Sequence, residues 1–298
     1  PHDIWVYKIF QPFLDLKVLS TLGRCNTFFE EYWQYVLKQN VIRVPEGCPT
    51  MTQAMDLAVV FSERNDCTKE NPVNIVVSEG EHEMVGVASK LKWGYPGLHT
   101  PVRCNNITIT GKGKGKTTIL GGFLVNDYKE NVKIEQLCVT NRDGYGLLCE
   151  ETFDVDVMEC DFKQCQYSGM CAHSDSYTVT ATRCGFLENG QCGVACAQTD
   201  TIVRLNECTI HHNGYAGITA NYYAVVDLHG TKTSIHSNKK YGIHARENAK
   251  VNIYLPSHHN TSHDNLVENQ NRNQELGGSI ANINVDGTFT HDVEEHHW

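Results

Sequence analysis

A glycine recurs along the middle of the chain at nearly constant spacing, and this repeat constrains the fold more than any other feature. The intervals between successive glycines, from Gly146 to Gly242, are 23, 24, 24 and 25 residues. An apolar residue follows each glycine, and a small residue comes two positions later. The apolar positions are Leu147, Met170, Val194, Ile218 and Ile243, and the small ones are Cys149, Ala172, Cys196, Ala220 and Ala245. Self-similarity at a fixed period of this length is typical of a solenoid.

Each unit is too short for a strand-helix-strand crossover but suits three short strands and three turns. Alternation with a period of two places the apolar and small positions on one side of a strand. A second alternating stretch follows in residues 153–157, 178–182 and 201–205. We therefore predict an all-β fold, a right-handed parallel β-helix whose single chain winds in coils of 23–25 residues. Equivalent residues of neighbouring coils would then stack ~4.8 Å apart in columns.

Two polar columns follow from this register. Asn189, Asn213 and Asn238 precede successive glycines, and we expect them to hydrogen-bond along the column and to satisfy buried turn backbone. A cysteine column is predicted at spacings of 22, 24 and 24 residues by Cys138, Cys160, Cys184 and Cys208. Parallel stacking keeps Cβ atoms further apart than the ~3.8 Å of a disulfide. Buried, reduced thiols are expected, which favours an intracellular location, cytoplasmic or nuclear.

Four segments are predicted along the chain. Residues 1–40 form an α-helical segment, residues 41–71 a linker and capping helix, residues 72–265 the β-helix, and residues 266–298 a C-terminal cap or tail. Thr50 is suited to cap an amphipathic helix over residues 50–62. That helix would cover the open edge of the first coil and so prevent edge-to-edge aggregation.

Charge and motifs exclude several classes of ligand. The 25 basic and 35 acidic residues give a net charge of -10, which disfavours nucleic acid and anionic membranes as partners. Residues 111–118 resemble a phosphate-binding loop, but Thr110 stands where the first glycine belongs and a strand pattern follows. We expect a basic turn there and no cofactor. His211 and His212 are adjacent on a predicted strand and should face opposite sides, so no metal site is predicted.

The outward column after the small residues is the candidate ligand surface. Its members, with one neighbouring outward position, are Glu150, His173, Asn221, His244 and Arg246. Glu150 and His173 lie on adjacent coils, whereas Arg246 lies four coils from Glu150, or ~19 Å away. Such residues cannot act together on one bond, so we assign no catalytic residue and expect a binding protein more than an enzyme.

Residues 1–40 carry more apolar surface than so short a segment can bury by itself. The pattern around Ile9, Phe10, Phe13, Leu14 and Leu16 resembles an F-box. In the F-box family this unit binds the Skp-type adaptor of a cullin-RING ubiquitin ligase, and the following domain captures a substrate protein. The resemblance therefore implies adaptor binding by these five residues. The alternative is that residues 1–40 only extend the N-terminal cap.

The later segments carry a second resemblance. Residues 50–80 and 107–111 look like the opening of pectin-lyase-like β-helices, and the repeats resemble coils shared by carbohydrate-binding proteins and sugar hydrolases. The stretches 255–265 and 278–284 are similar to a set of microalgal F-box-like proteins of unknown activity. Two functions are thus implied: a non-catalytic substrate-recognition subunit of a ubiquitin ligase or, alternatively, a carbohydrate-active polysaccharide lyase, glycosidase or glycan-binding protein.

An F-box predicts that Phe13→Ala or Leu14→Ala weakens binding to a Skp-type adaptor by at least about tenfold, because burying such a side chain at an interface contributes ~1.5–3 kcal/mol. The melting temperature of the β-helix should stay unchanged. A cap predicts the reverse, namely a lower melting temperature and no adaptor binding even by the unsubstituted protein. Adaptor affinity and thermal melting, measured on the same variants, separate the two hypotheses.

Overall fold

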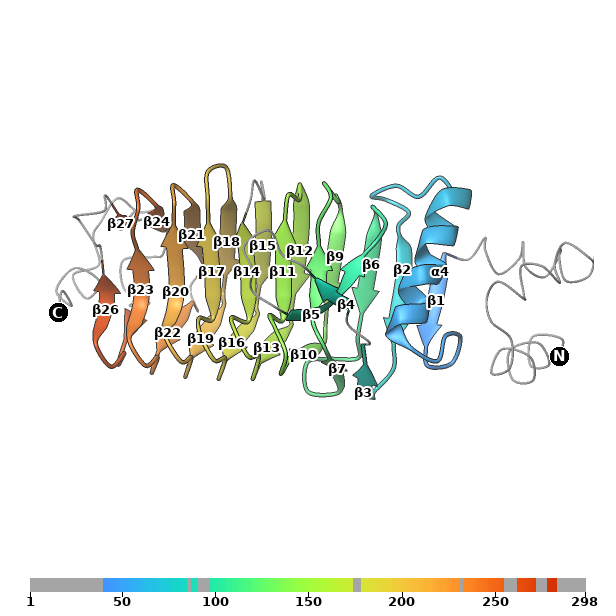
Figure 1. The fold of residues 1–298 in the computed structure, drawn as a ribbon, viewed down its shortest axis with the longest axis horizontal. Helices are drawn as coiled ribbons and strands as arrows, with labels where there is room; N and C mark the ends of the chain where they lie inside the picture. The colour runs from blue at the N-terminus through green and yellow to red at the C-terminus, as the bar shows by residue number, and fades with distance from the viewer. Residues whose placement is uncertain are drawn as a thin grey trace, which may run out of the picture.

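The chain winds into a long parallel solenoid (Figure 1). The computed structural model describes residues 40–84, 87–89, 97–173, 178–230, 233–254, 262–271 and 278–282. Within these residues, successive coils contribute to three sheets of ten, eight and nine strands. Neighbouring strands pair in parallel, except that β4 and β5 are antiparallel. The predicted all-β parallel solenoid is confirmed.

The strands of each sheet follow one another from coil to coil. The ten-strand sheet contains β1 (Val41–Val44), β2 (Val73–Val77), β6 (Ile107–Thr110), β9 (Val132–Glu135), β12 (Asp154–Met158), β15 (Thr178–Thr182), β18 (Ile202–Asn206), β21 (Val225–His229), β24 (Lys250–Ile253) and β27 (Ser279–Asn282). The eight-strand sheet contains β3 (Gly80–Glu83), β7 (Thr117–Leu120), β10 (Cys138–Thr140), β13 (Asp161–Lys163), β16 (Gly185–Leu187), β19 (Thr209–His211), β22 (Ser234–His236) and β25 (Ser262–His263). The nine-strand sheet contains β4 (Val87–Ser89), β5 (Gly97–Val102), β8 (Phe123–Val125), β11 (Leu147–Glu150), β14 (Met170–His173), β17 (Val194–Ala197), β20 (Ala216–Asn221), β23 (Tyr241–Ala245) and β26 (Glu268–Asn271).

The predicted apolar register is confirmed on the nine-strand sheet. Leu147 pairs with Met170, and the pairing continues through Val194, Ile218 and Ile243. All five side chains are fully buried, as are the small residues two positions later. Phe123 extends the same column toward the N-terminus. The core is therefore a set of columns in which each side chain packs on its equivalents in neighbouring coils.

The asparagine column forms as predicted and satisfies the turn backbone. Asn189 Nδ2 donates to Asn213 Oδ1 at 3.0 Å, and Asn213 Nδ2 donates to Asn238 Oδ1 at 2.9 Å. Each carboxamide also bonds to backbone, for example Asn213 Nδ2 to the carbonyl of Phe186 at 3.0 Å. Asn265 continues the column, accepting from Asn238 at 2.9 Å. Buried turn groups that water cannot reach are thus hydrogen-bonded from coil to coil.

The cysteine column needs one correction. Cys160, Cys184 and Cys208 are buried and in register, but Cys138 pairs with Asp161, so Leu137 takes the position level with Cys160. The reason is that the coil here is 23 residues long, one more than the spacing from Cys138 to Cys160. Spacing alone could not show this shift of one residue, which moves a side chain to the opposite face of the strand.

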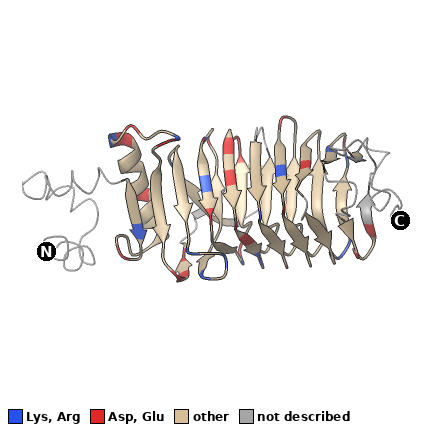
Figure 2. Cartoon of the chain, turned by 180° about the vertical axis from the view of Figure 1, so that it is seen from behind, with Lys and Arg blue, Asp and Glu red and all other residues tan. Residues whose placement is uncertain are grey.

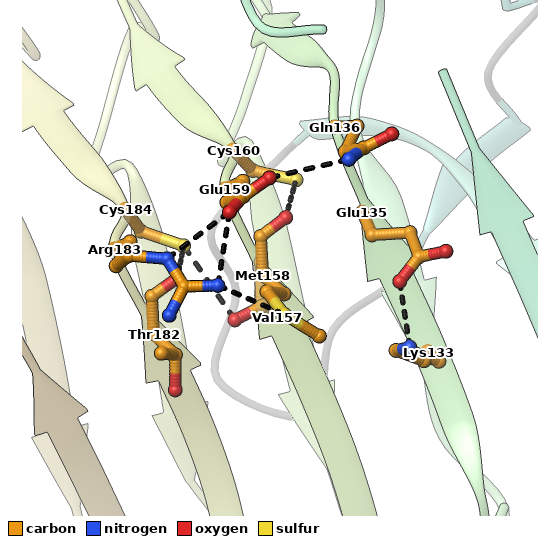
Figure 3. Close-up of polar contacts among 10 residues, drawn as sticks. All are labelled: Lys133, Glu135, Gln136, Val157, Met158, Glu159, Cys160, Thr182, Arg183 and Cys184. Atoms are coloured by element: carbon orange, nitrogen blue, oxygen red, sulfur yellow. Dashed lines mark hydrogen bonds and ion pairs between the residues drawn. The ribbon is translucent and has the colours of Figure 1, made fainter. Parts of the chain in front are cut away.

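The column thiols hydrogen-bond at the corner between the ten-strand and eight-strand sheets. Cys160 Sγ donates to the Met158 carbonyl at 3.3 Å, and Cys184 Sγ donates to the Thr182 carbonyl at 3.4 Å (Figure 3). Burial raises the pKa of the Cys160 thiol to about 12, which keeps it protonated at neutral pH. Within the described residues no cysteine forms a disulfide. These thiols therefore act as small apolar side chains with a weak donor.

The first coil is covered by the predicted helix. The helix α4 (Met51–Arg64) begins after Thr50, whose Oγ1 accepts from Gln53 N at 3.2 Å, as expected of an N-cap. Its buried side chains, including Met55 and Phe61, pack on the solenoid core. Strand β1 precedes this helix and β27 follows residue 265, so the strands extend beyond the predicted limits of the β-helix. The remaining predicted F-box segment, residues 1–39, lies outside the described residues.

The basic turn that resembles a phosphate loop leads directly into strand β7, as predicted. Its lysines bind carboxylates of the protein itself: Lys114 Nζ lies 3.0 Å from Asp161 Oδ1, and Lys116 Nζ lies 2.9 Å from Glu79 Oε1. Gly113 has a φ of 123°, which only glycine adopts easily. The loop is thus a turn that forms ion pairs with the coils that carry Asp161 and Glu79.

We expect Asn213→Ala to lower the free energy of unfolding by ~3 kcal/mol, because it leaves the Asn189 amide and the Phe186 carbonyl buried without their partners. Denaturant unfolding would measure the loss. Asn71→Ala, at an exposed turn position, is the control and should change the free energy by less than ~0.5 kcal/mol. Equal effects of the two substitutions would show that the column does not stabilise the solenoid.

Candidate functional site

The predicted ligand surface lies on the outer face of the nine-strand sheet. Glu150 and His173 are paired across β11 and β14, and Glu150 Oε1 lies 3.0 Å from His173 Nε2. Their side chains are only 13% and 11% exposed. The structure therefore brings this predicted pair together but leaves little of it accessible to a ligand.

A second apolar cluster lies on the outer face of this sheet. Leu124 and Leu148 point outward from β8 and β11 and pack with Tyr145, against which Tyr167 and Cys171 are also packed. Leu148 is fully buried although it lies outside the solenoid core. An outward position in a strand is usually solvated. The sequence shows the alternation but not which outward residues other side chains will cover.

The other predicted residues gather on β20 and β23. Arg246 Nε donates to Asn221 Oδ1 at 2.7 Å. His244 is 5% exposed and lies beside Tyr241 and Tyr215, with ring centroids 4.6 Å and 6.0 Å away. The coil of strand β17 lies between this group and the pair Glu150 and His173. On this outer face β17 presents only small side chains. The five predicted residues thus form two separate groups rather than one site.

His244 is held in its neutral form. Burial, together with the positive charges of Arg246 and Lys240, lowers its pKa from 6.5 to about 4. Lys240 Nζ also lies 5.0 Å from the centroid of the Tyr215 ring, a cation–π contact. The buried imidazole is therefore a packing and hydrogen-bonding group, 3.4 Å from the Tyr215 hydroxyl.

A more accessible set of polar residues crosses the outer face of the ten-strand sheet. We name it the charged row. Its members are Lys133, Asp156, Thr180, Arg204, Asp227 and Asn252. Each residue pairs in register with the next, one per strand from β9 to β24. Figure 2 shows this face, with blue and red positions alternating across the strands.

The contacts within the charged row are sparse and lie at the surface. Arg204 Nε is 3.9 Å from Asp227 Oδ2, and Asn252 Nδ2 donates to Asp227 Oδ1 at 2.9 Å. The Arg204 side chain is 47% exposed, so its remaining donors face solvent. Lys133 Nζ reaches Glu135 Oε2 at 2.6 Å on its own strand. The carboxylates of these two ion pairs are only 15% and 20% exposed, whereas the Lys133 side chain is 37% exposed, so a ligand would reach these pairs mainly through their cations.

The sequence contained a signal for the charged row that the prediction did not use. Residues 153–157 and 178–182 alternate polar and apolar side chains, and in residues 203–205 the polar Arg204 lies between two apolar residues. The alternation of Asp154 and Asp156 with Val155 and Val157 places both carboxylates outward. Comparing the outward positions of these second strands, rather than only those after the glycines, would have identified the row.

Two absences concern the described part of the chain alone. No group of three or more His, Cys, Asp and Glu side chains there is arranged to hold a metal ion. Among the same residues, no helix has the length and apolar character needed to cross a membrane.

Comparison with known proteins agrees with the coil geometry. Residues 90–207 match a family model described as "Right handed beta helix region". The predicted right-handed parallel β-helix is thereby confirmed as the class of this protein. No curated protein matches the sequence.

Three solved structures are similar to this chain at low sequence identity. The mannuronan C-5 epimerase AlgE4 A-module of Azotobacter vinelandii is 14% identical, with a TM-score of 0.41 over 69% of this chain and 71% of that chain. The ORF18 protein of Geobacillus virus E2 is 11% identical, with a TM-score of 0.48 over 84% of this chain and 61% of that one. The AlgE6 A-module from Azotobacter vinelandii is 11% identical, with a TM-score of 0.26 over 78% and 88%.

Because His244 is buried in its neutral form, we expect the folded protein to lose stability in acid. Its pKa is 6.5 when exposed and about 4 in the folded protein, so between these values the unfolded chain binds a proton that the folded chain does not. Stability is therefore complete above 6.5 and falls as the pH drops toward about 4. We expect His244→Gln to reduce the slope of melting temperature against pH in this window. An identical slope in the variant would contradict the assignment.

Proposed function

We propose that the protein is a non-catalytic binding protein for an uncharged polysaccharide, which lies along the charged row and across the strands of the ten-strand sheet. The observation that carries this proposal is the row itself: six polar side chains in register, one from each successive coil, of which Asp156 and Arg204 are the most exposed. The row is straight because parallel pairing translates each residue onto the next without rotation.

The spacing of the row suits a polymer with a short repeat. Coils succeed one another at ~4.8 Å, so a ligand parallel to the solenoid axis meets an equivalent side chain at each step. An extended sugar chain has a repeat of comparable length and carries hydroxyl groups along both edges. Each sugar can therefore meet one coil, and affinity accumulates over several weak contacts.

The charges of the row favour a neutral ligand. Lys133 and Arg204 are cationic, whereas Asp156 and Asp227 are anionic, and the two signs are interspersed along the row. A polyanion or polycation would meet a repelling charge at every third coil. Sugar hydroxyls instead donate to carboxylates and accept from guanidinium, ammonium and amide groups. The net charge of -10 further disfavours anionic polymers.

A peptide is a poorer candidate for the same face. The backbone of a strand inside a sheet is already hydrogen-bonded to both neighbours, so this face offers only side chains. Peptides usually bind sheets by adding a strand to an open edge. The ten-strand sheet has its edges at β1 and β27, at the two ends of the described solenoid.

The spacing of carboxylates supports binding rather than hydrolysis along the row. Asp156 and Asp227 are three coils apart, or ~14 Å, beyond the ~5–9.5 Å that separates the two carboxylates of most glycosidases. Asp154, two residues from Asp156, is held by Lys69, with Oδ2 3.1 Å from Nζ. Release of new reducing ends from a bound polymer would contradict the non-catalytic part of the proposal.

The test is binding of soluble neutral polysaccharides, with a uronic acid polymer in parallel, by affinity electrophoresis and calorimetry. Arg204→Ala should weaken binding by about tenfold or more, because hydrogen bonds from a charged group contribute ~1.5–3 kcal/mol. Arg183→Ala is the matched control: its side chain is 48% exposed, it binds Glu159 at the sheet corner, and it lies outside the row (Figure 3). Failure of all neutral polymers to bind, or equal losses in both variants, would refute the proposal.

The residues predicted to bind the adaptor lie outside the described part of the chain: Ile9, Phe10, Phe13, Leu14 and Leu16. Adaptor binding stays a prediction, and so does a role in a ubiquitin ligase. The two functions are compatible, since a polysaccharide-binding β-helix could present glycosylated proteins to a ligase. The adaptor measurement on Phe13→Ala decides that question independently of the charged row.

A further inference from the structure

A column of histidines crosses the outer face of the eight-strand sheet near its C-terminal end. His211, His236 and His263 are in register on β19, β22 and β25. The rings of His211 and His236 are stacked at 4.9 Å with planes 10° apart, and those of His236 and His263 at 5.1 Å with planes 11° apart. The charged row and the nine-strand face do not involve these residues.

His212 joins this column although it neighbours His211 in sequence. Strand β19 ends at His211, and His212 has a φ of 57°, in the left-handed region. The alternation of side chains therefore stops, and the two rings lie on the same side, with centroids 4.9 Å apart. Nδ1 of His211 is 2.7 Å from Nδ1 of His212. The prediction that these neighbours face opposite sides is wrong, because it assumed that the strand continues.

We propose that Nδ1 of His211 and Nδ1 of His212 together chelate one divalent copper ion. With metal–nitrogen distances of ~2.0–2.1 Å, two ligands at a right angle are ~2.9 Å apart and two at a tetrahedral angle ~3.3 Å apart. The observed 2.7 Å is nearer to the right angle. Square or tetragonal coordination by nitrogen and oxygen is typical of Cu²⁺, whereas Zn²⁺ favours the tetrahedron. Cu²⁺ also binds most tightly among the common divalent metals.

Water completes the coordination of this ion. The chelate needs only two protein ligands, which agrees with the lack of any three-ligand group among the described residues. His236 does not supply a third: its ring is parallel to that of His211, and its Nδ1 lies 3.1 Å from Ser237 Oγ. It stacks beside His211 and contributes no ligand atom.

Both imidazoles can offer their Nδ1 lone pairs without net loss of a proton. In the metal-free pair one Nδ1–H donates to the other Nδ1, and metal binding requires that this proton move to Nε2 of the same ring, a change of tautomer.

The test is titration with Cu²⁺ alone, followed by calorimetry and electron paramagnetic resonance. Every protein used carries alanine at His2, His258, His259, His291, His296 and His297, so that histidines near the chain ends do not contribute. His211→Gln and His212→Asn remove one ligand each, and asparagine tolerates the left-handed backbone at position 212. His236→Ala is the matched control within the column. Thermal melting verifies that each variant is folded.

We expect one ion per chain, a resonance signal with two imidazole nitrogens, and affinity at least about tenfold weaker in either ligand variant. The His236→Ala protein should bind within about twofold of its parent. Affinity unchanged in His211→Gln and His212→Asn would overturn the proposal. A signal with a single nitrogen in the parent protein would do so as well, even if a variant failed to fold.

Discussion

Parallel hydrogen bonding between successive coils is the constraint on which the rest of this structure depends. It holds each residue level with its equivalent one coil away, from β1 to β27 in the ten-strand sheet. Every position in the repeat therefore becomes a column, and in the buried columns each residue meets copies of itself or close substitutes. Apolar columns fill the core, the asparagine column satisfies a turn, and the thiol column lines a corner.

The corners of the coils show how local backbone and columns support each other. At the corner after the ten-strand sheet, Gln136, Glu159, Arg183 and Glu207 all have positive φ, between 52° and 57°. Such conformations are unfavourable for residues with a Cβ, and the inter-coil hydrogen bonds compensate. The side chains there pair along the column, since Glu159 accepts from both Gln136 and Arg183. Because successive coils repeat this positive-φ corner, the corner side chains of neighbouring coils can hydrogen-bond to one another.

The three outer faces have different character because different groups lie over them. The nine-strand face carries an apolar cluster around Leu148 and Tyr145, and Glu150 and His173 on the same face are only 13% and 11% exposed. The ten-strand face exposes Arg204, whereas Asp227 beside it is 15% exposed. The eight-strand face presents stacked imidazoles. The same coils thus present a packed face, a face crossed by a polar row and a face of stacked imidazoles.

The sequence by itself determined the coil, because its period and alternation fix which residues are equivalent. The columns of Leu147 and Asn213 and the capping helix after Thr50 could all be predicted from spacing and capping chemistry. Three features depended on tertiary structure: the one-residue shift at Cys138, the covering of Glu150 and the meeting of His211 with His212. The spacing of residues shows which positions are equivalent in successive coils. The length of an individual coil, the burial of an outward side chain and a positive φ at the end of a strand are decided only when the coils pack together.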